Sequence, residues 1–132
     1  MTRTEPAKPT ILVVDDEIGI LNLLTSVLRR YGFEVLTASE GIKGVETYRQ
    51  NRSAIDLVLL DAQMPNSDGV KTLTELQRID PAVPVAFMSG SSGEFSSGEL
   101  LGIVHVFRKP FLSLTYLAHT VKELIGLRNA KV

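Results

Sequence analysis

The stretch at residues 56–69 reads DLVLLDAQMPNSDG and joins an apolar run to a carboxylate and then to a turn. The apolar run spans Ala54–Leu60 and shows no regular polar alternation. Short runs rich in valine, isoleucine and leucine are typical of strands buried on both faces of a parallel sheet. Asp61 follows at once, so we expect its carboxylate at the carboxyl end of a buried strand.

Four further runs of the same kind lie on either side of this stretch. They are Thr10–Val14, Phe33–Thr37, Val83–Met88 and Ile103–Phe107, of which Phe33–Thr37 is the weakest. Each is short enough for a strand and bounded by residues that favour turns. The sequence therefore predicts five buried strands.

The segments between these runs have the periodicity of amphipathic helices. Apolar residues recur at helical spacing in four sets: Ile20, Leu24, Val27, Leu28 and Tyr31; Ile42, Val45 and Tyr48; Val70, Leu73, Leu76 and Ile79; and Leu114, Leu117, Val121 and Leu124. Gly32 and Pro81 follow two of these sets and are expected to end the helices. Strands that alternate with helices predict a parallel sheet with helices on both faces and right-handed crossovers.

The stretch at residues 89–98, SGSSGEFSSG, lacks this periodicity. Ser-Ser-Gly-Glu occurs at 91–94 and again at 96–99, and each copy matches the capping box that opens a helix. Interior glycines disfavour a helix, so a short fourth helix and a flexible loop both remain open. Because apolar anchors are few, we expect this region to be mobile and to be ordered by a modification or a partner.

The composition excludes several classes of protein. The chain has 132 residues, a net charge of −1 and no cysteine. One domain is expected at residues 10–127, after a disordered lead at 1–9 and before a frayed tail at 128–132. The charge argues against a nucleic-acid binder that works through bulk charge, and the missing cysteines exclude disulfides and thiolate metal sites. No apolar run approaches a membrane span, and the polar N-terminus does not resemble a secretory signal.

Five polar residues follow the predicted strands: Asp15, Asp16, Asp61, Ser89 and Lys109. In an open parallel sheet the carboxyl ends of the strands meet at one edge, where ligands bind. Taken singly, Asp16 is interpreted as a helix cap, Ser89 as a turn residue and Lys109 as solvated surface. Taken together, three carboxylates in one corner repel each other unless a cation lies among them. Magnesium, which prefers oxygen ligands, fits best.

Other catalytic chemistries find little support. The chain has no phosphate-binding P-loop, no dinucleotide-binding glycine pattern and no zinc-protease helix motif. His105 and His119 are interpreted as a residue at the sheet margin and a residue on the exposed face of the last helix. Ser89 lacks the G-x-S-x-G context and a plausible histidine base, which disfavours a hydrolase.

The chain resembles the receiver domain of two-component response regulators. The resemblance rests on ILVVDDE at 11–17, DLVLLDAQMPNSDG at 56–69, FMSG at 87–90 and FRKPF at 107–111, and it covers residues 10–127. It implies a flavodoxin-like (βα)5 three-layer sandwich with a parallel five-stranded sheet of order 2-1-3-4-5. It also implies a cytoplasmic signalling switch that catalyses its own phosphoryl transfer and dephosphorylation.

The resemblance implies a role for each site residue. Asp61 is the expected phosphoacceptor. Asp16 is expected to bind Mg²⁺ directly and Asp15 largely through water, with Asp61 and the backbone carbonyl of Gln63 completing the protein ligands. Ser89 is expected to meet the phosphoryl group, and Lys109 is expected to pair with the Asp61 carboxylate and then with a phosphoryl oxygen.

Val106 departs from the family pattern, because its position usually holds an aromatic residue that moves inward on activation. Phe107 is adjacent but should face the other side of the sheet, into the core. The implied donor is a sensor histidine kinase or a histidine phosphotransfer protein. An unknown output protein is expected on the face of the fourth helix, fifth strand and fifth helix, without nucleic acid or membrane. A phosphorylation-independent scaffold and an excised rather than stand-alone domain remain open.

Overall fold

The computed structural model describes residues 8–64, 67–90 and 102–129. Its main sheet consists of β1 (Thr10–Val14), β2 (Glu34–Ala38), β3 (Ile55–Asp61), β6 (Val85–Ser89) and β7 (Ile103–Arg108). These strands are all parallel and lie in the order β2-β1-β3-β6-β7. The predicted order 2-1-3-4-5 is confirmed, since β6 and β7 are the fourth and fifth strands of this sheet.

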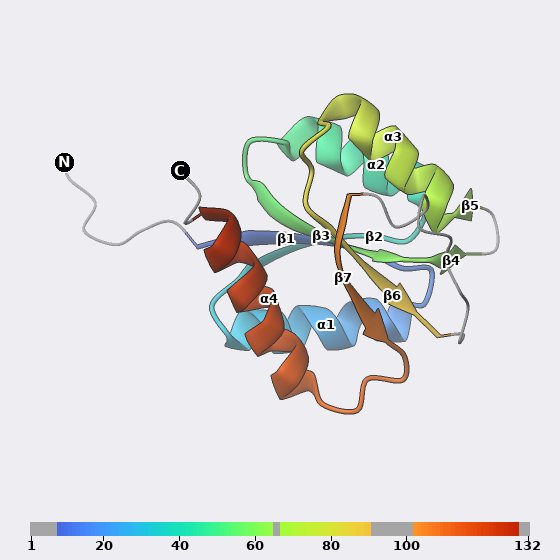
Figure 1. Cartoon of the computed structure of the whole chain (residues 1–132). Coiled ribbons are helices and arrows are strands. Elements are labelled where there is room, and N and C mark those ends of the chain that lie inside the picture. Colours follow the sequence, from blue (N-terminus) through green and yellow to red (C-terminus); the bar gives the residue numbers. More distant parts are fainter. Residues whose placement is uncertain (1–7, 65–66, 91–101, 130–132) are drawn as a thin grey trace.

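Helices cover both faces of the sheet (Figure 1). They are α1 (Ile18–Arg30), α2 (Gly41–Asn51), α3 (Gly69–Ile79) and α4 (Leu114–Asn129). The helices α1 and α4 lie on one face, and α2 and α3 lie on the other (Figure 1). The predicted three-layer α/β fold is therefore confirmed. The possible short helix, with its two capping boxes at 91–94 and 96–99, lies outside the described residues, as does most of the predicted disordered lead.

Alternate residues of the strands pack into two separate cores. On β3, Leu57 and Leu59 join the core under α1 and α4, whereas Val58 and Leu60 join the core under α2 and α3. All four side chains are almost fully buried. Each contributes roughly 1.5–3 kcal/mol relative to an exposed position. The lack of polar alternation in the sequence thus reflects a strand with no solvated face.

The predicted stop at Gly32 is confirmed. Gly32 adopts φ +94°, in the left-handed region where a side chain is disfavoured. Its N–H donates to the carbonyl of Arg29, and the N–H of Phe33 donates to the carbonyl of Leu28. These bonds satisfy the last carbonyls of α1 and turn the chain into β2.

The expected packed face of α2 was wrong at one position. Ile42 is 78% exposed, whereas Gly41, Gly44 and Tyr48 are buried. A Cβ on Gly44 would lie 2.8 Å from the nearest Val14 side-chain carbon. The helix therefore approaches β1 along a face of small residues, which turns Ile42 towards solvent.

A short antiparallel hairpin follows β3, formed by β4 (Gln63–Met64) and β5 (Ser67–Asp68). It closes at the first residue of α3, where the N–H of Gly69 donates to the carbonyl of Ala62 over 2.9 Å. A Cβ on Gly69 would lie 2.6 Å from the Cα of Ala62. The absence of a side chain at this position lets α3 begin directly against the backbone that follows Asp61.

Candidate functional site

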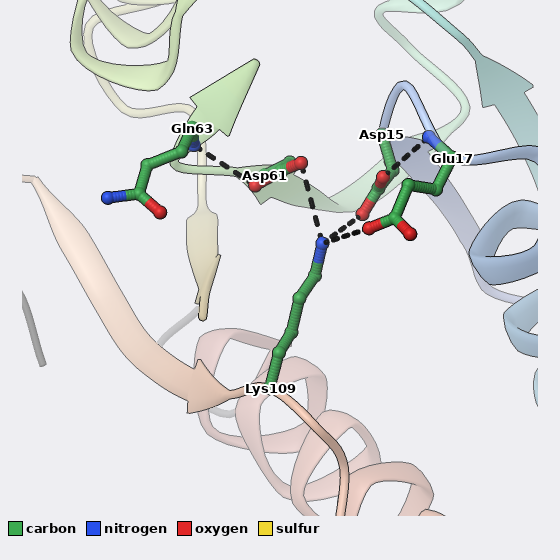
Figure 2. A network of polar contacts seen from close by, with 5 residues as sticks. All are labelled: Asp15, Glu17, Asp61, Gln63 and Lys109. Carbon is green, nitrogen blue, oxygen red and sulfur yellow. Dashed lines mark hydrogen bonds and ion pairs between the residues drawn. The ribbon is translucent and has the colours of Figure 1, made fainter. Parts of the chain in front are cut away.

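The carboxyl ends of β1, β3, β6 and β7 meet at one edge of the sheet. The sheet register pairs Val14 with Leu60, Asp61 with Met88, and Ser89 with Arg108. Residues that end or follow these strands are thereby brought together, as the sequence predicts, and they are Asp15, Asp16, Asp61, Ser89 and Lys109. Figure 2 shows Asp15, Asp61 and Lys109 pointing toward one another.

Three carboxylates form a compact cluster at this edge. Oxygen atoms of Asp15, Asp16 and Asp61 all lie within 4.8 Å of one another. Asp15 and Asp61 are buried, whereas Asp16 is exposed. Mutual repulsion at this distance is relieved by a cation, and a donor set made only of oxygen atoms suits a hard ion such as Mg²⁺.

Lys109 supplies positive charge to the cluster. Its Nζ lies 2.7 Å from Asp15 Oδ2, 3.4 Å from Asp61 Oδ2 and 3.7 Å from Glu17 Oε1 (Figure 2). Burial alone would lower the pKa of Lys109. The hydrogen bond to Asp15 and the charges of Asp15 and Asp61 outweigh it and raise this pKa above its ordinary value. Lys109 is therefore held as an ammonium.

The backbone fixes the origin of the Lys109 side chain. Its N–H donates to the carbonyl of Ser89 over 2.8 Å, which continues the pairing of β6 with β7 by one residue. Ser89 is itself buried at 3% exposure. The hydroxyl-bearing residue and the lysine are therefore held side by side at the strand ends.

The surroundings of the Asp61 carboxyl group disfavour its ionised form. Burial raises its pKa from an ordinary value of 3.8 to about 6, and the neighbouring charge of Asp15 acts in the same direction. The N–H of Gln63, which donates to Asp61 Oδ1 over 3.0 Å, and the ammonium of Lys109 lower the pKa in part. A cation or a second positive group would stabilise the ionised form further.

Both oxygens of Asp15 already have partners. Oδ1 accepts the N–H of Glu17 over 2.9 Å, and Oδ2 accepts the ammonium of Lys109. The N-cap of α1 is Glu17, so the interpretation of Asp16 as a helix cap is wrong. Asp16 is thus left at the exposed rim of the cluster, where a cation has access to it.

An open hollow of about 600 Å³ lies over the cluster. It is lined by Asp16, Glu17, Asp61, Ala62, Gln63, Met64, Gly90 and Lys109. The side chain of Gln63 points away from Lys109, while its backbone faces Asp61 (Figure 2). Glu17 is the last residue of the ILVVDDE segment and is not among the predicted site residues. Its place two residues after Asp15 is the sequence signal that points to it.

The two sides of β7 differ as expected. Phe107 is buried in the core with α1 and α4, whereas Val106 packs, partly buried, against the core with α2 and α3. His105 lies on β7 and contacts the Phe107 ring at 4.6 Å between centroids. His119 is exposed on α4 and contacts the Tyr31 ring edge-on. Neither histidine lines the hollow over the carboxylates.

The fold is a parallel α/β sheet whose strand ends bring together three carboxylates, a hydroxyl and a lysine. This combination is typical of signalling domains that accept a phosphoryl group, and sequence comparison identifies the family. The sequence model of the response regulator receiver domain family matches residues 11–122, so the chain belongs to this family. Asp15, Asp16 and Asp61 form the acidic pocket that is typical of a phosphoacceptor aspartate and of Mg²⁺ binding in such receivers.

Two relatives illustrate the family. The transcriptional regulatory protein PrrA of Mycobacterium tuberculosis is 36% identical over 129 residues, with 96% of this chain and 54% of that protein covered. Sporulation initiation phosphotransferase F of Bacillus subtilis is 31% identical over 121 residues, with 90% and 95% covered. The chain thus spans about half the length of the first relative and almost all of the second.

Solved structures agree with the fold. A response regulator receiver domain protein from Clostridium thermocellum superposes with a TM-score of 0.83 at 31% identity, covering 94% of this chain and 99% of that one. The response regulator TrrA of Thermotoga maritima, in complex with Mg²⁺-BeF, gives 0.79 at 28% identity, covering 88% and 98%. Within the described residues, no helix is long and apolar enough to cross a membrane.

Proposed function

We propose that Asp61 is the phosphoacceptor of a two-component phosphorelay and that its phosphorylation depends on Mg²⁺. The observation that carries the proposal is the position of the buried Asp61 carboxylate beside Asp15 and 3.4 Å from the ammonium of Lys109. The donor in this proposal is the phosphohistidine of a sensor histidine kinase or of a histidine phosphotransfer protein. Such a donor implies a cytoplasmic location, which is part of the proposal.

The proposed reaction is an attack of an Asp61 oxygen on the phosphorus of the donor. A new O–P bond forms while the N–P bond to the donor imidazole breaks, and the imidazole leaves with the electron pair. Like charge opposes this approach, so catalysis consists of positioning and electrostatic stabilisation. Lys109 is proposed to pair first with the carboxylate and then with a phosphoryl oxygen. The Ser89 hydroxyl is proposed to donate a hydrogen bond to the phosphoryl group.

Mg²⁺ fits the oxygen donors of the site. Asp16 is proposed to bind the ion directly, Asp15 largely through water, and Asp61 and the Gln63 carbonyl as the other protein ligands. Both carboxylate oxygens of Asp15 already accept hydrogen bonds, which supports binding of the ion by Asp15 through water. When bound, the ion would neutralise the charge of the incoming phosphoryl group. Hydrolysis by water at phosphorus would return Asp61 to its free form.

The proposed output is a change of partner affinity. A phosphorylated side chain carries about −1.5 to −2 charges, and coupling of about 1–3 kcal/mol changes partner affinity roughly 5–150-fold. Ser89 and Val106 are the proposed switch residues. The proposed partner surface is the face that the resemblance implies, made by the segment between β6 and β7 together with β7 and α4. The domain boundaries 10–127 belong to the same proposal.

A phosphorylation-independent scaffold is the second candidate. Val106 favours it, because this position lacks the aromatic side chain that most receivers move on activation. The presence of Asp15, Asp16, Asp61, Ser89 and Lys109 at one edge favours the phosphoacceptor more strongly.

Intact-mass measurement after incubation with Mg²⁺ and a small phosphodonor separates the two candidates. The phosphoacceptor proposal expects a gain of one phosphoryl group, lost in Asp61→Asn. Asp56→Asn is the matched control, because Asp56 lies on the same strand and accepts the N–H of Thr10 at the far end. No gain in the wild type with any donor favours the scaffold.

A further inference from the structure

Glu17 is a fourth acidic side chain at the site and takes no part in the proposed cation binding or phosphoryl transfer. Its side chain is 65% exposed, Glu17 lines the hollow over Asp61, and Oε1 lies 3.7 Å from the Nζ of Lys109. Its backbone is fixed, because its N–H donates to Asp15 and its carbonyl accepts the N–H groups of Ile20 and Leu21. The Glu17 side chain is thus tethered at the mouth of the site.

The charges around Lys109 do not balance. Asp15, Asp16, Glu17 and Asp61 supply four carboxylates against one ammonium. A divalent cation offsets two of these charges, and a phosphodonor then brings negative charge of its own through the hollow that Glu17 lines. Coulomb repulsion grows with the charge of the donor and is weakened by salt.

The contact of Glu17 with Lys109 is a second way in which Glu17 disfavours a charged donor. Its ammonium is shared among Asp15, Asp61 and Glu17, at 2.7, 3.4 and 3.7 Å. An incoming phosphoryl oxygen must compete with these carboxylates for the ammonium. Because Glu17 is the most exposed of the three, it is the competitor that a donor meets first.

We propose that Glu17 is a specificity-determining residue that selects against small, multiply charged phosphodonors, through its charge at the mouth of the site and its contact with Lys109. The inference rests on the proposed phosphorylation of Asp61. It assigns discrimination among donors to a residue outside the proposed set of metal ligands and reacting groups. Glu17 slows the reaction of a donor less when that donor carries less negative charge.

The test compares wild type with Glu17→Gln and two donors of different charge. Acetyl phosphate is a dianion at neutral pH and phosphoramidate a monoanion, and the rate of phosphoryl gain is followed by intact mass at saturating Mg²⁺. Glu46→Gln is the matched control, because Glu46 is similarly exposed and pairs with Arg49 on α2. Since Glu17 makes no side-chain cap bond, the variant is expected to fold, and circular dichroism checks this.

We expect Glu17→Gln to react roughly 2–10-fold faster than wild type with acetyl phosphate at low salt. The gain should be smaller with phosphoramidate and should shrink as ionic strength rises, while Glu46→Gln matches the wild type. An unchanged rate, or an equal gain with both donors at every salt concentration, would overturn the inference alone. Failure of the wild type to react with either donor would overturn the proposed function and this inference together.

Discussion

The ammonium of Lys109 donates a 2.7 Å hydrogen bond to Asp15, a residue 94 positions away in the sequence. Lys109 follows the edge strand β7 and Asp15 follows β1, so the bond crosses the ends of β3 and β6. This pairing holds Nζ within 3.4 Å of Asp61 without making Asp61 its nearest partner. Lys109 therefore joins the edge strand β7 to the central strands β1 and β3 through its contacts with Asp15 and Asp61.

Removal of this ammonium should destabilise the fold. In Lys109→Met, the carboxyl groups of Asp15 and Asp61 lose their positive partner, and we expect a loss of about 1–3 kcal/mol in the free energy of unfolding at pH 7 without divalent ions. Urea denaturation measures it. Lys43→Met is the control, because Lys43 makes only an exposed pair with Glu40. Equal stability of Lys109→Met and wild type would contradict the role of Lys109.

The pKa of Asp61 makes stability depend on pH in a predictable direction. Because the folded-state pKa is raised from 3.8 to about 6, the folded state binds the proton more tightly than the unfolded state. Stability from this group is therefore present below pH 4 and is lost as the pH rises through 6. Asp61→Asn should be more stable than wild type by up to about 3 kcal/mol at pH 7 without divalent ions, and similar to it near pH 4.

Urea denaturation at several pH values tests this difference, with Asp56→Asn as the matched control. Subtracting the stability of wild type from that of Asp61→Asn removes the contribution of other titrating groups. A difference that stays constant from pH 4 to pH 7 would show that Asp61 titrates normally in the folded protein.

Divalent cations should stabilise the wild type. Binding to the folded state alone adds about 2.7 kcal/mol at a concentration one hundred times Kd. We expect Mg²⁺ to raise the Tm of wild type and to have much less effect on Asp16→Asn, whose side chain is the accessible carboxylate of the cluster. Calorimetric titration provides Kd for both proteins. Equal affinities would contradict the proposed role of Asp16.

A side chain at position 69 should destabilise the protein. A Cβ there would lie 2.6 Å from the Cα of Ala62 and 2.9 Å from the carbonyl oxygen of Asp61, so the backbone after Asp61 must shift. We expect Gly69→Ala to lose about 1–3 kcal/mol and to be phosphorylated more slowly. The control Gly126→Ala meets no atom within 4 Å on α4 and should gain up to about 1 kcal/mol. Thermal denaturation of both variants compares them directly.

The sequence alone predicted the layers of the fold and the site residues that end the strands. Strands such as β3 are buried on both faces. Their apolar runs therefore predict a buried strand without any knowledge of the rest of the chain. The strand order then dictates that Asp15, Asp61 and Lys109 share one edge. The order itself came from the family resemblance.

Other features depend on packing that the sequence does not display. Ile42 is exposed because Gly44 allows α2 to approach Val14 closely, and periodicity alone does not reveal which face of a helix approaches most closely. The preference of Lys109 for Asp15 over Asp61 depends on distances that follow only from the assembled sheet. The role of Val106 in switching stays a prediction.

Chemical location of the phosphoryl group tests directly whether Asp61 is the phosphoacceptor. Wild type treated with Mg²⁺ and a phosphodonor is reduced with borohydride, which converts an acyl phosphate of aspartate to homoserine, and the digest is sequenced by mass spectrometry. We expect homoserine at position 61 and unchanged Asp15, Asp16 and Asp56. An unmodified Asp61, or conversion of another aspartate in its place, would contradict this role of Asp61.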